Sequence, residues 1–137
     1  MTLARHGKGQ AVYAAGALEA EDPPVSRWLV AALIRRLLGG PPAVQADAPS
    51  FVEVTVFEKD AGRLWNISLV ALREQDDCVP CDAAVRVQIP PGRRPAAVRA
   101  LPGGEAHPFT VTAGTLAFAV SGLEILKMFQ IEWAQAL

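Results

Sequence analysis

The chain has 137 residues, enough for one compact domain with a core of ordinary size and too few for two full-sized ones. Its 13 basic and 14 acidic side chains give a formal net charge of −1, which argues against a surface that binds nucleic acid. The 51% hydrophobic and 20% charged fractions are typical of a folded globular protein and exclude an extended disordered chain.

No segment has the pattern of a membrane span or a secretion signal. The longest weakly charged stretch, residues 25–38, contains three arginines and is shorter than the roughly 20 apolar residues that a bilayer crossing needs. The N-terminal residues 1–10 are partly basic and lack an apolar run that ends in a small-residue cleavage site. We therefore expect a cytoplasmic protein with no membrane partner.

The first predicted elements are a short strand and a helix. Residues 10–15 follow a glycine-bearing turn at 6–9 and have the β-propensity of a strand. Asp22 stands before two prolines as a helix N-cap, and paired glycines and prolines follow at 39–42. Between these signals, apolar residues recur at helical spacing: Trp28, Leu29, Ala32, Leu33 and Leu37. We predict a helix over residues 23–38.

After Pro49 the hydrophobic period changes to two, which is typical of strands with one buried face. The predicted strands are 51–58, 63–72, 84–89, 96–101, 109–112, 115–120 and 124–133. The first two form a hairpin through a turn at 59–62. The sequence therefore predicts a mainly β protein: an antiparallel β-sandwich, Ig-like or related, preceded by one short strand and one α-helix.

A composition change at residues 39–50 divides an N-terminal βα segment, 1–42, from the sandwich domain, 43–137. One strand and one helix cannot bury their own apolar surface, so the segment packs on the sandwich or on another chain. Its strand lacks a predicted neighbour, and its helix is apolar on a second face. We predict a homodimer through this segment; the alternative is that the strand joins the edge of its own sandwich.

Cys78 and Cys81 have the Cys-x-x-Cys spacing of zinc knuckles and redox dithiols. A structural zinc needs four ligands, and the chain offers no second pair of cysteines and no pair of closely spaced histidines. Acidic residues surround the pair in a predicted loop, 74–82, and these do not stabilise a thiolate. We expect a loop-closing or idle pair and no cofactor, with redox or metal work as the alternatives.

The remaining candidate groups are carboxylates and tryptophans. Glu53 and Glu58 fall on opposite faces of one predicted strand, so they do not form the carboxylate pair that glycoside hydrolysis needs. Exposed tryptophans stack on sugar rings, but Trp28 and Trp65 lie on apolar stripes, where core packing is expected. Trp133 lies near the end of the chain and is less clearly a core residue. If their rings are exposed, Trp133 and Trp65 are the candidate sugar-stacking residues.

Five motifs follow one another along the chain. Residues 7–13, Gly-Lys-Gly-Gln-Ala-Val-Tyr, form a glycine-led strand motif. Four further strand motifs lie at 49–56, 62–70, 85–90 and 118–132. This order resembles β-galactosidase-like and fucosidase-like multidomain glycoside hydrolases, in which the last βα unit of a flavodoxin-like domain precedes a small C-terminal antiparallel β-domain.

The resemblance implies a chain that lies outside the barrel where such enzymes keep their catalytic carboxylates, so no catalytic residue carries over. We therefore expect a non-catalytic accessory or assembly domain, not an enzyme by itself. Its expected partner is a second copy or a separate glycoside hydrolase chain. The alternative is a carbohydrate-binding module that uses exposed aromatic residues.

Overall fold

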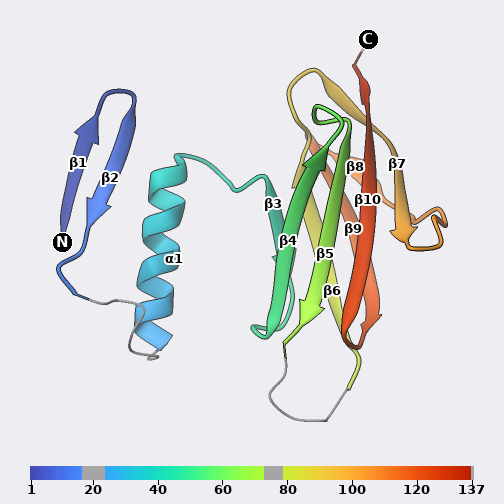
Figure 1. Cartoon of the computed structure of the whole chain (residues 1–137), viewed down its shortest axis with the longest axis horizontal. Helices are drawn as coiled ribbons and strands as arrows, with labels where there is room; N and C mark the ends of the chain where they lie inside the picture. The colour runs from blue at the N-terminus through green and yellow to red at the C-terminus, as the bar shows by residue number, and fades with distance from the viewer. Residues whose placement is uncertain (17–23, 73–78, 137) are drawn as a thin grey trace. The chain divides into compact units, whose positions relative to one another are not determined.

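A computed structural model describes residues 1–16, 24–72 and 79–136 (Figure 1). The chain forms two compact units, Met1–Pro42 and Ala43–Leu137. The first contains a hairpin and a helix, and the second contains two antiparallel sheets. Among the described residues, no helix has the length and apolar character that a bilayer crossing requires.

The N-terminal hairpin consists of β1 (Thr2–His6) and β2 (Gly9–Tyr13), which pair antiparallel along their whole length. Gly7 makes the turn with φ +57°, a left-handed conformation that glycine adopts without steric cost. The predicted strand at 10–15 is β2, whereas β1 was not predicted. The expectation that β2 has no neighbour within its own segment is therefore wrong.

The predicted helix is α1 (Pro24–Leu38). Proline suits the first helical position because its missing N–H has no partner there. Arg35 and Arg36 lie in the last turn, where cations offset the helix dipole, and Gly39 follows with φ +68° as a helix-ending residue. Trp28 is 69% exposed, so the core packing expected for this residue is wrong.

The second unit is a β-sandwich, as predicted. Its first sheet has the strand order β4 (Val52–Lys59), β5 (Leu64–Ala71), β10 (Leu126–Gln135) and β7 (Arg93–Leu101). Its second sheet has the order β3 (Val44–Asp47), β6 (Cys81–Gln88), β9 (Thr115–Leu123) and β8 (Thr110–Thr112). All neighbouring strands are antiparallel, and the predicted β4–β5 hairpin is confirmed. Figure 1 shows the two sheets as layers.

The sandwich core follows from the alternation in the strands. Alternate residues of β5, β6, β7, β9 and β10 point between the sheets. Nine of these side chains are under 2% exposed: Ile67, Leu69, Leu116, Leu123, Ile131, Val85, Val87, Val98 and Val120. Burial of each such side chain stabilises the fold by roughly 1.5–3 kcal/mol. All members of the core cluster belong to the second unit.

Candidate functional site

Both tryptophans expected at a sugar site lie in or against the sandwich core. Trp133 is 4% exposed, and a ring so deeply buried has no free face for a sugar, so the stacking role for Trp133 is contradicted. Trp65 is half-buried and packs against the core cluster, as expected for this residue. The two rings meet edge to face, with centroids 5.5 Å apart and planes at 76°.

The structure describes one member of the cysteine pair. Cys81 opens β6 and is half-buried, and its thiol donates to the main-chain oxygen of Leu123 over 3.6 Å. Cys81 and Asp82 belong to this strand, so the predicted loop ends earlier than expected. Cys78 lies outside the described residues, so the pair remains a prediction. The described part of the chain has no cluster of three or more groups suited to a metal ion.

His107 lines a hollow of about 610 Å³. The hollow lies between the first residues of β10 and the last residues of β7 and β9. One ring nitrogen, Nε2, lies 2.8 Å from the main-chain oxygen of Ala119, and the ring packs on Phe118 and Phe129. Lys127 also lines the hollow and donates to the main-chain oxygen of Ser121 at 2.6 Å. Among the residues that the structure describes, no carboxylate lines the hollow.

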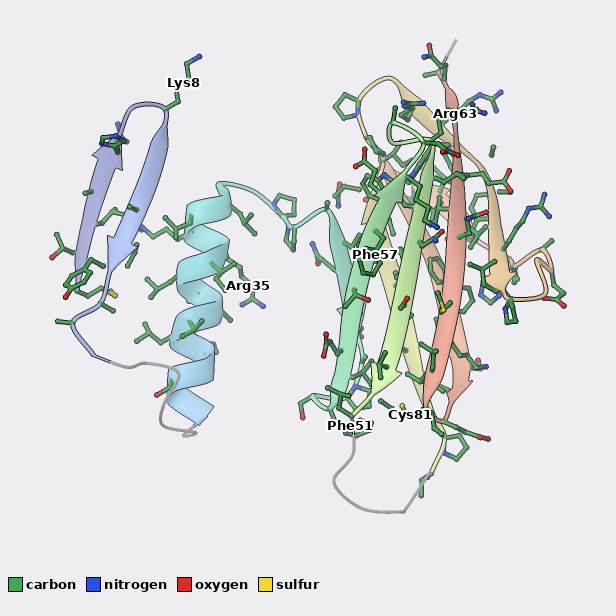
Figure 2. The ribbon with its side chains drawn as sticks, in the orientation of Figure 1. Lys8, Arg35, Phe51, Phe57, Arg63 and Cys81 are labelled. Atoms are coloured by element: carbon green, nitrogen blue, oxygen red, sulfur yellow. The ribbon has the colours of Figure 1, made fainter. Side chains whose placement is uncertain are left out.

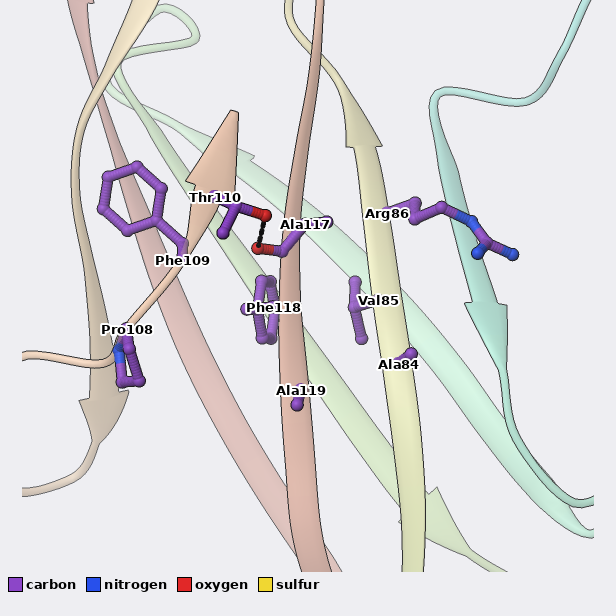
Figure 3. Close-up of a pocket in the computed structure, with 9 residues that line it drawn as sticks. All are labelled: Ala84, Val85, Arg86, Pro108, Phe109, Thr110, Ala117, Phe118 and Ala119. Atoms are coloured by element: carbon purple, nitrogen blue, oxygen red, sulfur yellow. Dashed lines mark hydrogen bonds between the residues drawn. The ribbon is translucent and has the colours of Figure 1, made fainter. Parts of the chain in front are cut away.

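A second hollow, of about 440 Å³, lies over β6, β9 and the start of β8 (Figure 3). Its floor is made by the small side chains of Ala84, Ala117 and Ala119, and Phe109 stands at its rim. Of the residues that the structure describes, Arg86 is the one charged side chain that lines it. The small apolar side chains of its floor therefore suit an apolar group.

One end of the sandwich gathers exposed apolar side chains from β5, β10 and the segments beside them. Leu72, Ile125 and Leu126 are 57%, 62% and 50% exposed. Main-chain hydrogen bonds bring them together, because Ala71 donates to Ile125 at 2.8 Å and Leu126 pairs with Val70. We call Val70, Leu72, Ile125 and Leu126 the apolar end. Sequence reasoning missed it because its residues lie 54 positions apart, from Leu72 to Leu126, and become neighbours only through the β5–β10 pairing.

Comparisons with known proteins find a similar fold in a part of one solved enzyme structure. No protein-family model and no curated protein matches the chain. The chain is similar to the solved structure of alpha-L-fucosidase isoenzyme 2 from Paenibacillus thiaminolyticus, with a TM-score of 0.68 and 21% identity. The similarity covers 81% of this chain and 18% of the fucosidase chain, so this chain spans less than a fifth of that enzyme's length. At this identity the likeness shows a shared fold, in coarse agreement with the resemblance in the sequence.

Proposed function

We propose that the chain is a non-catalytic accessory domain of a glycoside hydrolase system, which packs on a catalytic domain or a separate catalytic chain. The observation that carries this proposal is the fold shared with a segment of an alpha-L-fucosidase. Because the shared segment is 18% of that enzyme, most of its chain has no counterpart here. A piece of this size fits a supporting role beside a catalytic domain.

The placement of three described carboxylates, Glu53, Glu58 and Glu132, is consistent with an accessory role. Glycoside hydrolysis needs one carboxyl group as acid and a second as nucleophile or base, on opposite sides of the bond that breaks. Glu53 and Glu58 alternate between the faces of β4, and Glu132 is held by the guanidinium of Arg99 at 2.6 Å. Neither arrangement presents two free carboxyl groups to one bond.

The apolar end supplies a surface for the proposed partner. A soluble protein buries clustered apolar side chains at contacts with other proteins more often than it leaves them in water. Leu72, Ile125 and Leu126 are each at least half exposed and lie on two neighbouring strands or beside them. In the proposed assembly these side chains pack on the catalytic domain.

The proposal is tested with the purified chain, alone and mixed with the glycoside hydrolase chain encoded nearest to it. The chain alone is expected to release no nitrophenol from aryl fucosides or galactosides, and the mixture to co-elute in size-exclusion chromatography. Leu126→Asp should reduce co-elution at least about tenfold, because a carboxylate is costly in an apolar contact.

The matched control is Val111→Asp on β8, since Val111 is 48% exposed and Leu126 is 50% exposed. Equal loss in both variants would show that the apolar end is not the contact. Turnover by the chain alone, copurifying with it through two columns, would overturn the non-catalytic role.

A further inference from the structure

A row of four side chains crosses the whole first sheet on the face that points away from the core. Phe57 on β4 pairs with Asn66 on β5, Asn66 pairs with Gln130 on β10, and Gln130 pairs with Arg99 on β7. Directly paired residues lie on the same face of a sheet. Their chain neighbours, such as Ile67, face the core, so these four side chains face outward. We call Phe57, Asn66, Gln130 and Arg99 the polar row. Figure 2 shows Phe57 on β4.

Hydrogen bonds hold the polar members of the polar row in place. The Gln130 Nε2 group donates to Asn66 Oδ1 at 3.0 Å. The guanidinium of Arg99 donates to Glu132 at 2.6 Å and to the main-chain oxygen of Gly104 at 3.3 Å. Side chains fixed in this way lose little conformational entropy when a ligand binds.

Two polar groups beside this network keep free hydrogen-bonding capacity. Asn66 and Ser68 lie on the outer face of β5 and are only 9% and 8% exposed. Within the described residues, the Ser68 hydroxyl and the Asn66 amide nitrogen have no hydrogen-bond partner. Most buried polar side chains have a hydrogen-bond partner. The Ser68 hydroxyl and the Asn66 amide nitrogen are not among the fully buried atoms that lack one, so solvent reaches both. These groups can therefore bind a ligand that carries hydroxyl groups.

The charge and the apolar surface of the polar row narrow the ligand class. Phe57 is 61% exposed and offers an aromatic face beside the amides, while the charge of Arg99 is balanced by Glu132. A pyranose ring has an apolar face that packs on an aromatic ring and hydroxyl groups that exchange hydrogen bonds with amides and guanidinium groups. We propose that the polar row binds a neutral oligosaccharide, independently of the assembly role proposed above.

A protein partner fits this part of the face less well. The buried centre of a protein interface is depleted of charged residues and rich in large apolar ones. Asn66, Gln130 and Arg99 make most of the polar row polar. Arg99 in addition forms an ion pair with Glu132 at 2.6 Å. A cluster of exposed aliphatic side chains lies instead at the apolar end, where Leu126 pairs with Val70.

The test is a ¹H–¹⁵N NMR titration of the full chain with cellohexaose, xylohexaose, mannohexaose and a fucosylated galacto-oligosaccharide. At least one sugar is expected to shift the side-chain NH₂ signals of Asn66 and Gln130. Phe57→Ala should weaken its binding about tenfold, because the stacking platform is lost. Gln130→Met, which keeps the side-chain length and removes the amide, should weaken it by a similar factor.

The matched control is Tyr13→Ala, since Tyr13 is also exposed, at 69%, but belongs to the N-terminal hairpin. It should leave the affinity unchanged, and the melting temperature of each variant verifies folding. A flat titration with every sugar, or equal loss in the Tyr13 variant, would overturn the proposal. Shifts at Asn66 and Gln130 that depend on protein concentration alone would assign the face to a second copy and overturn it as well.

Discussion

Trp133 lies in the sandwich core, and Trp65 packs against it. Their rings meet edge to face at 5.5 Å, an arrangement that stabilises aromatic pairs. Each indole N–H is nevertheless buried without a hydrogen-bond partner in the described part of the chain. A buried unpaired donor costs roughly 1–3 kcal/mol, so the packing of the two rings has to offset that cost.

This balance predicts how substitutions of Trp133 behave. Trp133→Ala should destabilise the sandwich by about 3–5 kcal/mol, because it leaves a large cavity in the core. Trp133→Phe should cost clearly less, since it keeps an aromatic ring and removes the unpaired N–H. Urea unfolding followed by far-UV circular dichroism measures both variants. An alanine variant within about 1 kcal/mol of the parent would contradict the core role.

At the scale of elements, the β4–β5 hairpin depends on an unusual turn. Asp60 and Ala61 both have φ +50°, and Gly62 has φ +80°. Main-chain bonds close the turn, from Gly62 to Lys59 and from Arg63 to Asp60, each at 3.1 Å. Two residues with side chains adopt a conformation that glycine tolerates best, so the turn is strained at those positions.

We predict opposite effects for two substitutions in this turn. Gly62→Ala should destabilise the sandwich by about 1–2 kcal/mol, because its backbone is left-handed and the new Cβ would lie 2.8 Å from Glu58 Oε1. Ala61→Gly should be neutral or stabilising, since relief of strain offsets the added backbone entropy. Thermal unfolding of the two variants tests this pair. Equal destabilisation would show that the turn conformation carries no strain.

The strands that the sequence predicted are those with clear alternation. Val52, Val54 and Val56 mark β4 because they repeat every second residue. Thr2–His6 and Val44–Asp47 were missed, because each contains a single large apolar side chain, Leu3 or Val44, so no alternation is visible. Their partners, β2 and β6, supply the hydrogen bonds that make them strands.

The polar row could not be predicted in the same way. Asn66 and Gln130 are 64 residues apart, and their contact depends on the register between β5 and β10. A sequence pattern fixes which face a residue takes but not which residue of a distant strand lies opposite. Phe57 did carry a signal, since it occupies the polar side of its strand with Glu53 and Thr55.

At the scale of the whole molecule, the first unit has much apolar surface for its size. Tyr13, Trp28, Ile34 and Leu38 are 69%, 69%, 53% and 56% exposed. A two-stranded hairpin with one helix has little core of its own, so such surface favours association. The proposed homodimer therefore rests on exposed side chains, since the unpaired strand edge that first motivated it is paired with β1.

Light scattering on two proteins tests the dimer. The full chain should be dimeric, and a truncated chain that begins at Ala43 should be monomeric. The truncated chain should still unfold cooperatively, because every residue of the core cluster lies beyond Ala43. A monomeric full chain, or a truncated chain that stays dimeric, would remove the dimer from consideration.

The order of strands in the first sheet has a consequence for synthesis of the protein. β10 lies between β5 and β7, yet it leaves the ribosome after both of them. Until it emerges, β7 has no neighbour in its sheet and β5 pairs only with β4. The first sheet therefore stays incomplete until β10 emerges. During that interval its unpaired strand edges are open to chaperones, proteases and aggregation.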